Sequence, residues 1–447
     1  MDQIINLSFP HIGEQILNNF STTKVLEFSQ VSKTWKVLAE NSIIKRWKGR
    51  LPTVLKTLKS SKPEVIKILL QHAKIETAEL NQHYNGLNLF MWACKYGHIG
   101  VVKQLLQRAD IDFNDKDTSE TKNTAFMWAC QNGHQDVVKL LLEHSDTIDY
   151  NAFNGRYEIL KWTAFVIACR SGQKEVVELL LEQSADKNIE LNGEVGLKYT
   201  LSAMCPWGGN HPQNVDGHVA VIKLLMDQKT IKIDFNSKGF LTSRDIPILE
   251  ACKTGNLDVV KLFLDYADTK NIDVNGSGYE GITPLIYACK KGTEGEELFK
   301  LFLDYSGNSS INWNAKDDYG RTPFLWACLR ENKFMVKSLL DQSEIKNIDL
   351  NAKDENGFTG FIHLCFGYRE DFLKWFLKYA KRNQIDWNAK ESGGQTGLKV
   401  ACQYNYPQAV KILLRYAKSK GMEVPEPTPD YQYFMPEINR ILEKYKR

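Results

Sequence analysis

The sequence has no long hydrophobic run, no large excess of one charge and no two cysteines close together. No apolar stretch approaches the ~18 residues that a membrane-spanning helix needs, so we expect no membrane contact. The 57 basic and 54 acidic side chains leave a net charge of +3, which predicts no nucleic-acid partner. The first residues, Met-Asp-Gln-Ile-Ile-Asn, lack the basic flank and the cleavage site of a signal peptide.

Motifs of catalysis and of cofactor binding are missing as well. We find no Gly-rich phosphate-binding loop, no acid/base pair and no catalytic triad, and therefore predict a non-catalytic protein that needs no cofactor. Metal ligands usually come in close pairs, and the cysteines form no such pairs. His211 and His218 lie near each other, but two histidines without further ligands do not indicate a metal site. Without paired cysteines or a signal peptide, we expect a reducing compartment, the cytoplasm, with the nucleus as the alternative.

The nine cysteines instead mark an internal repeat. They lie 36 to 47 residues apart, at positions 94, 130, 169, 205, 252, 289, 328, 365 and 402. Each ends a short apolar string such as Phe-Met-Trp-Ala-Cys94, and most are followed by a second string such as Val137-Val-Lys-Leu-Leu-Leu. The second string has the spacing of an amphipathic helix, and a glycine such as Gly133 separates the two. The pattern predicts an all-α chain of repeated helix pairs.

The repeat resembles the ankyrin repeat. Its best matches begin at Thr283-Pro284-Leu285 and at Thr322-Pro323-Phe324, and the resemblance covers about residues 51–420. The resemblance implies a solenoid of about ten helix-turn-helix units, which we expect to be opened by a degenerate repeat near residues 54–72. One unit departs from the pattern, because about nine extra residues fall within 206–218.

One row of residues, two positions before each cysteine, is a candidate binding surface. In ankyrin arrays, as the resemblance implies, this position faces the concave surface that holds partner proteins. Large aromatic side chains there can anchor an interface, or they can pack between repeats, and the sequence leaves both readings open. For Trp207 on the inserted loop, the two alternatives are an anchor of the loop itself and a contact with a partner. The candidate substrate-binding residues are Trp92, Trp128, Trp207, Glu250, Tyr287, Trp326 and His363.

Two other residue types have ordinary structural explanations. The cysteines all occupy one position on an apolar helix face, so we predict buried core residues rather than thioester-forming nucleophiles. The turn asparagines Asn314, Asn351 and Asn388 are expected to bond to nearby backbone. The family resemblance adds asparaginyl hydroxylation as an alternative for them.

Residues 1–50 carry no repeat signal and form a different module. Apolar residues recur there at helical spacing, with Ser21-Thr-Thr between two short helices. The segment resembles an F-box through Phe9-Pro10, Ile16-Leu17, Phe20 and the string Val31-Ser32-Lys33-Thr34-Trp35. It departs from that family by having Phe9 in place of leucine, Lys24 in place of aspartate and one residue fewer between Pro10 and Ile16.

Together, the two resemblances imply an adaptor of an SCF-type cullin-RING ubiquitin ligase. The F-box would dock on the Skp-type subunit, and the concave face of the array would hold a substrate protein. Two alternatives remain: an ankyrin scaffold with no ligase partner, and a pathogen-type effector that recruits a host ligase. The residues implied to contact the Skp-type subunit are Phe9, Pro10, Ile16, Leu17, Leu26 and Val31.

Residues 421–447 form the last segment. Three prolines between Gly421 and Asp430 predict a stiff linker. Pro436 is expected to open a short helix with an apolar side, which would cap the last repeat. A free peptide motif is the alternative. The apolar side comprises Ile438, Ile441, Leu442 and Tyr445.

Overall fold

The computed structural model is helical throughout the residues that it describes. These residues are 25, 27, 33–47, 66–68, 70, 80–144, 147–155, 162–191, 215–228, 233–238, 245–305, 307, 311–367, 369–380, 384–426 and 435–446. Within these ranges, β-pairing is confined to three isolated bridges, Tyr84 with Leu87, Lys116 with Thr124, and Lys390 with Thr396. The predicted all-α class is confirmed.

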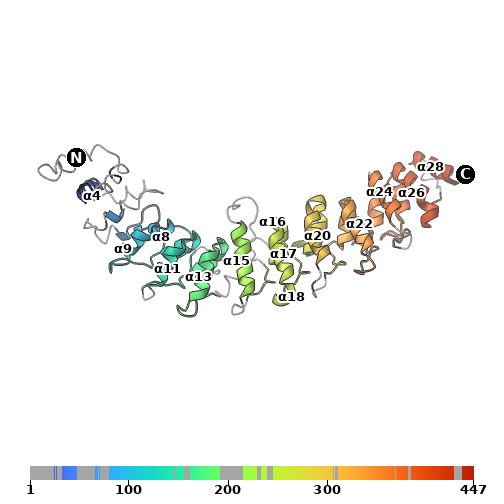
Figure 1. Cartoon of the computed structure of the whole chain (residues 1–447). Coiled ribbons are helices and arrows are strands. Elements are labelled where there is room, and N and C mark those ends of the chain that lie inside the picture. Colours follow the sequence, from blue (N-terminus) through green and yellow to red (C-terminus); the bar gives the residue numbers. More distant parts are fainter. Residues whose placement is uncertain are drawn as a thin grey trace. The chain divides into compact units, whose positions relative to one another are not determined.

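The chain forms two compact units, of which the first comprises residues 1–204 and 211–233 and the second residues 205–210 and 234–447. Within each unit, helices stack in order along the sequence (Figure 1). The helices of the first unit are α4 (Lys33–Trp47), α8 (Leu89–Lys95), α9 (Ile99–Leu105), α10 (Ala125–Gln131), α11 (Gln135–Leu142), α12 (Ala164–Arg170), α13 (Lys174–Gln183) and α15 (Val215–Asp227).

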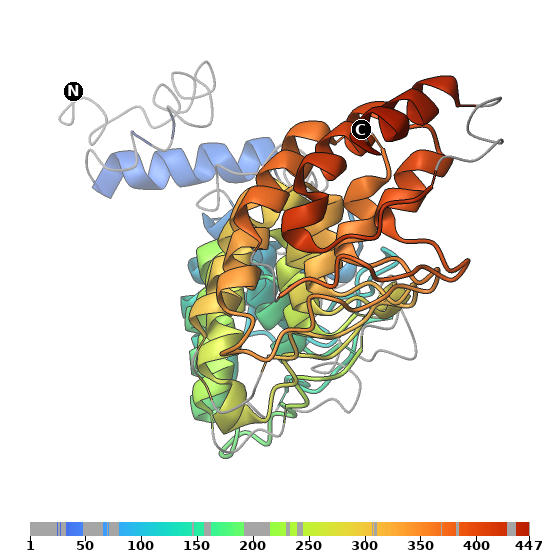
Figure 2. The same ribbon diagram turned by 90° about the vertical axis from the view of Figure 1, so that its right-hand side faces the viewer.

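The second unit repeats the same pairing of a short inner helix with a following outer helix. Loops between successive pairs extend to one side of the helices (Figure 2). Its helices are α16 (Pro247–Thr254), α17 (Leu257–Asp265), α18 (Ala267–Lys270), η2 (Tyr279–Gly281), α19 (Pro284–Lys291), η3 (Gly292–Gly295), α20 (Glu296–Asp304), α21 (Pro323–Leu329), α22 (Lys333–Asp341), α23 (Gly360–Cys365), α24 (Glu370–Tyr379), α25 (Gly397–Gln403), α26 (Pro407–Lys420) and α28 (Pro436–Lys446).

Most inner helices begin at a side-chain cap. The Thr322 hydroxyl accepts a hydrogen bond from the backbone N–H of Leu325 at 3.3 Å, and Pro323 occupies the first turn. This cap satisfies one of the backbone donors that a helix start leaves unpaired. Helix α16 instead begins after Ile246, without a side-chain cap. Equivalent caps are Asn88, Thr124, Thr163, Thr283, Thr359 and Thr396.

Glycines with positive φ separate inner from outer helices, as the sequence predicts. Gly97 has φ of 70°, and a Cβ at this position would lie 2.6 Å from Nδ1 of His134 in the next repeat. Both the backbone angle and the close approach therefore require glycine. Gly133, Gly172 and Gly255 have the same left-handed backbone.

The repeated cysteines lie in the core between inner helices. All eight within the described ranges are buried, whereas Cys205 lies outside them. The Sγ of Cys328 faces Gly360 of the next inner helix, where a Cβ would come within 3.1 Å of the sulfur. Burial raises the pKa of seven of these thiols, and that of Cys402 to about 12, which removes the thiolate that a nucleophile needs. The prediction of small core residues is confirmed.

The two ends of the chain carry further helices. Helix α4 buries Leu38, Ala39 and Ile43 while Val37 is exposed, so one of its sides is packed. The residues implied to contact a Skp-type subunit, Phe9, Pro10, Ile16, Leu17, Leu26 and Val31, lie outside the described residues. At the other end, Pro436 opens α28, which buries Ile438 and Leu442 and packs against α26.

Candidate protein-binding surface

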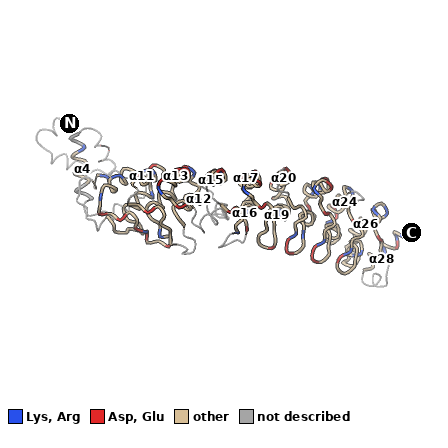
Figure 3. Tube along the Cα trace, turned by 90° about the horizontal axis from the view of Figure 1, so that it is seen from below, with Lys and Arg blue, Asp and Glu red and all other residues tan. Residues whose placement is uncertain are grey.

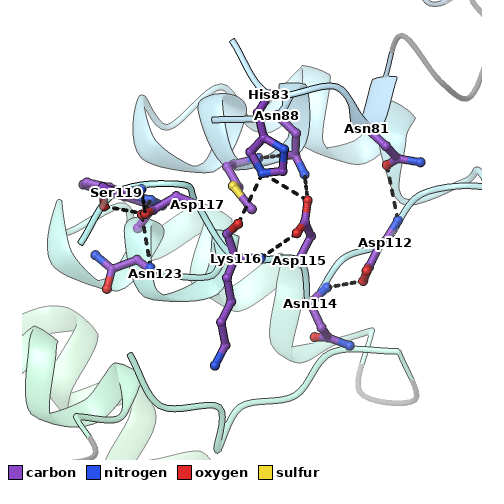
Figure 4. Close-up of polar contacts among 12 residues, drawn as sticks. Asn81, His83, Asn88, Asp112, Asn114, Asp115, Lys116, Asp117, Ser119 and Asn123 are labelled. Atoms are coloured by element: carbon purple, nitrogen blue, oxygen red, sulfur yellow. Dashed lines mark hydrogen bonds and ion pairs between the residues drawn. The ribbon is translucent and has the colours of Figure 1, made fainter. Parts of the chain in front are cut away.

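The segments that lead from an outer helix to the next inner helix are held together by side chains. We call these segments, residues 110–124, 273–283, 311–322, 348–359 and 385–396, the fingers. Each shows the Asx and backbone turns expected of its Asp, Asn and Gly content. In the first of them, Asn114 N–H donates to Asp112 Oδ1 at 3.0 Å (Figure 4).

An asparagine in each repeat joins it to the next. Asn314 donates to the carbonyl of Asn347 at 2.8 Å and accepts from the backbone N–H of Asp349 at 2.8 Å. The turn asparagines thus bond to backbone, as predicted, but the prediction that these bonds are local is wrong, because the amides reach 33 to 35 residues along the chain. The local turn bond is made by a different side chain: the aspartate or asparagine two residues before each turn asparagine accepts that asparagine's backbone N–H. The same bridge is made by Asn81, Asn114, Asn151, Asn236, Asn351 and Asn388.

Lysines and backbone groups add further links between fingers. Lys316 Nζ donates to the carbonyl of Lys353 at 3.0 Å, and Lys353 Nζ donates to that of Lys390 at 2.7 Å. At the finger tips, Glu355 N–H donates to the Tyr319 carbonyl at 3.0 Å. These repeated bonds align the fingers into a continuous surface within the unit.

A buried aspartate fixes three of the five fingers, 110–124, 311–322 and 348–359, to the inner helix that follows. Asp317 accepts the backbone N–H groups of Tyr319 and Arg321 at 3.0 and 2.8 Å, and the indole N–H of Trp326 at 2.9 Å. In the 110–124 finger, Asp117 likewise accepts the indole N–H of Trp128 at 3.0 Å. Figure 4 shows Asp117 with its finger partners Ser119 and Asn123.

In the next repeat after Trp326, a histidine takes the place of the indole. His363 Nε2 lies 2.7 Å from Asp354 Oδ2. Burial by itself would raise the pKa of Asp354. The hydrogen bonds from His363 and from the backbone N–H groups of Phe358 and Asn356 outweigh it and lower that pKa below its ordinary value.

The candidate binding row is thus largely enclosed. Trp92, Glu250 and Trp326 are buried, and Trp128, Tyr287 and His363 are half-buried. Trp207 lies outside the described residues. The contacts place Trp128, Trp326 and His363 between a finger and its helix, and contact with a substrate protein remains a proposal for all seven.

Cationic side chains cover the rings of this row. Lys95 Nζ lies 3.7 Å from the ring centroid of Trp128 in the next repeat, and Lys290 lies 5.1 Å from that of Trp326. Both lysines directly follow the cysteine of the preceding repeat. Burial lowers the pKa of Lys95, against the opposing effect of Asp117. Contact of a cation with an indole face is favourable, so these pairs strengthen the stack.

Two features of this surface were not foreseen from the sequence. Arg321 and Arg330 also lie over Trp326, with their guanidinium carbons 5.0 and 5.5 Å from the ring centroid. In the following repeats, Phe366 contacts Tyr404, with ring centroids 4.9 Å apart, and contacts Tyr406 at 5.6 Å. For the arginines over Trp326, the sequence offers one indication, which is that Arg321 directly precedes the Thr-Pro helix start.

Two histidines link consecutive repeats through their side chains. His134 Nε2 lies 2.9 Å from the Lys95 carbonyl, and His218 Nε2 lies 2.9 Å from that of Arg170. Gln173 fills the same place in the repeat between them. His218 belongs to α15, so the chain resumes the repeat pattern after the insertion. Within the described ranges, no three His, Cys, Asp or Glu residues are grouped to hold a metal ion.

Comparisons with known proteins identify the family. A model of the family described as ankyrin repeats (3 copies) matches residues 36–117, 113–190, 214–312 and 248–354. These segments span more than half of the chain, which therefore belongs to the ankyrin-repeat family. Arrays of this family are protein-interaction modules. No described helix is long and apolar enough to cross a membrane.

Two solved structures are similar to parts of this chain. EF0377, an ankyrin repeat protein, is 21% identical, with 44% of this chain and 92% of that chain covered and a TM-score of 0.36. The ankyrin repeat domain of Bcl-3, a unique member of the IkappaB protein family, is 18% identical, with 54% and 94% covered and a TM-score of 0.39. Comparison with curated proteins gave no match.

Proposed function

We propose that the chain is a non-catalytic adaptor that holds a substrate protein on the finger and inner-helix surface of its array. The observation that carries this proposal is the ordered surface itself. Asparagine bridges, finger lysines and buried aspartates hold successive repeats in register. A preorganised surface loses little conformational entropy when a partner binds, which favours tight recognition.

We further propose that residues 1–50 dock the Skp-type subunit of an SCF-type cullin-RING ubiquitin ligase. Support comes from the F-box resemblance at Phe9-Pro10, Ile16-Leu17 and Val31-Ser32-Lys33-Thr34-Trp35. Helix α4 begins at Lys33, inside the last of these strings, and has a packed apolar side. Binding both partners at once would raise the effective concentration of substrate lysines near the conjugating enzyme.

The test is binding of a purified Skp-type subunit to the full chain. We expect a stable complex that is lost in the variant Leu17→Asp/Val31→Asp, because each change puts a charge into the apolar contact. Asp substitution at the exposed Val37 of α4 is the matched control and should leave binding intact. Absence of binding by the unaltered chain, or equal binding by the double variant, would reject the ligase role.

The second candidate is an ankyrin scaffold without a ligase partner. One observation favours it: the ankyrin match begins at residue 36, so it includes most of α4. On this reading, α4 belongs to the first repeat and caps the array. The scaffold predicts no binding of the Skp-type subunit, but it predicts the same substrate surface.

A further inference from the structure

Three cationic side chains of the second unit surround one indole ring. The charged groups of Lys290, Arg321 and Arg330 lie 5.1, 5.0 and 5.5 Å from the ring centroid of Trp326. They come from α19, from the 311–322 finger and from the end of α21. Since all three lie near one centroid, no two are more than about 11 Å apart, close to the ~8 Å screening length of physiological salt. Their mutual repulsion is therefore only partly screened.

The neighbouring carboxylates compensate this charge only in part. Glu280 pairs with Lys290 at 3.2 Å, and the buried Asp317 lies beside the ring, where it accepts the finger N–H groups and the indole N–H. Two carboxylates against three cations leave one positive charge in excess. Arg330 uses its Nε for the carbonyl of Lys290 at 2.6 Å. In the described part of the chain, no carboxylate lies within ion-pair distance of Arg321 or Arg330.

Arg321 adds a second, independent observation. Its Nε is buried and has no hydrogen-bond partner within the described residues. A buried charged donor without an acceptor is unfavourable, which leaves the charge of this half-buried guanidinium poorly compensated, and an anionic group at the exposed part of the side chain would reduce that cost. A guanidinium group presents a planar pair of donors that matches a carboxylate or a phosphoryl group.

We propose that Lys290, Arg321 and Arg330, which are gathered over the buried Trp326, form a recognition site for an anionic side chain of a bound peptide. The inference rests on the proposed function that the array holds a partner protein, and it specifies the chemistry of that partner. An Asp or Glu carboxylate and a phosphoryl group share the required charge and geometry.

The charges of the fingers favour a peptide over a nucleic acid. Exposed acidic residues, Asp318 and Glu355, occur on the same fingers, and Figure 3 shows basic and acidic positions mixed along the loops of this unit. A polyanion would meet acidic as well as basic groups on these fingers, whereas a peptide can place one anionic group among the three cations.

A cluster of aromatic side chains, which includes Phe358 on the next finger, offers a second contact for the same peptide. Phe358 follows Asp354 by four residues, as Arg321 follows Asp317, so the two side chains occupy equivalent places on consecutive fingers. Phe358 contacts Phe366, which is 39% exposed, and Phe366 contacts Tyr404, which is 53% exposed.

The distance between the two contacts predicts a spacing in the peptide. The inner helices α21 and α23 pack side by side. Packed helices lie about 8–10 Å apart, and an extended peptide advances about 3.3 Å per residue. The preferred peptide therefore carries an apolar residue about three positions from its anionic residue.

The test is selection of a phage-displayed dodecapeptide library on the immobilised full chain. We expect enriched peptides to carry Asp or Glu with an apolar residue about three positions away. Synthetic copies of the enriched peptide carry Gln or phosphoserine at the acidic position. The Gln copy shows whether binding needs the negative charge, and the phosphoserine copy shows whether a phosphoryl group can replace the carboxylate. Enrichment without acidic residues, no enrichment of any peptide, or tighter binding of a single-stranded oligonucleotide would overturn the proposal.

Variants of the chain locate the binding. Arg321→Gln/Arg330→Gln should weaken the enriched peptide by about tenfold or more, and Arg321→Lys/Arg330→Lys should restore part of the affinity. Arg415→Gln, at an exposed arginine of α26, is the matched control and should bind normally. If the double variant does not fold, the single change at the exposed Arg330 replaces it. Equal binding by the glutamine variant would contradict the site, while binding of a Skp-type subunit reports separately on the proposed ligase role.

Discussion

Asn351 and Asp386, which stand in consecutive repeats, are joined by a 2.7 Å hydrogen bond from the backbone N–H of Asp386 to the amide oxygen of Asn351. The same amide donates to the carbonyl of Gln384 at 3.2 Å. One side chain therefore makes two bonds to the next repeat. This bridge recurs in both units, and it couples repeats that touch only their neighbours.

Removing one bridge should destabilise the second unit. Asn351→Ala deletes both hydrogen bonds and leaves backbone groups without partners, so we expect a loss of about 1–3 kcal/mol in the free energy of unfolding. Chemical denaturation followed by circular dichroism measures it. Asn356→Ala, at an exposed asparagine of the same finger, should change stability little. Equal effects of the two substitutions would show that the bridge contributes nothing.

The bond between Trp326 and Asp317 gives a second prediction. Trp326→Phe keeps an aromatic ring but removes the indole donor from a buried carboxylate, which should cost about 1–3 kcal/mol. Trp375→Phe, on the outer helix α24, makes the same chemical change at a half-buried site and should cost less. A denaturant series on both variants tests the prediction, and a larger loss at Trp375 would contradict it.

Asp354 makes stability depend on pH in a defined direction. Its pKa is lower in the folded chain than the ordinary value of about 3.9, so its stabilising contribution is complete above that value. The contribution is lost as the pH falls through the folded pKa. The stability difference between the unaltered chain and Asp354→Asn should therefore be largest near neutral pH and shrink below about pH 4.

Unfolding curves across that pH range measure the difference. Glu355→Gln, at an exposed acid of the same finger, is the control, and its effect should be small throughout. A difference for Asp354→Asn that grows as the pH falls would have the wrong sign.

The buried cysteines should be chemically silent in the folded protein. In a Cys205→Ser background, all eight remaining cysteines are buried, and burial raises the pKa of seven of their thiols, so we expect no reaction with a thiol reagent until the chain unfolds. Reaction rates with and without denaturant measure this. Ser392→Cys, at an exposed finger position, supplies a thiol that should react at once. Rapid reaction of any of the eight in the folded chain would contradict the prediction.

The sequence by itself determined the repeat and its core. The cysteine period, the Thr-Pro helix starts and the glycines between helices depend on local backbone geometry and on burial at a fixed helical position, so they can be read one repeat at a time. The burial of Cys328 and the cap at Thr322 follow from such patterns.

Only the tertiary structure decided how the repeats contact one another. The turn pattern around Asn314 predicts a local backbone bond, but the partners of its amide lie 33 and 35 residues away, in the next repeat. The gathering of Lys290, Arg321 and Arg330 over Trp326 arises in the same way, because the stack brings together positions up to 40 residues apart. Local propensity carries no information about such pairs, since they depend on which side chains the stacking of one repeat on the next brings into contact.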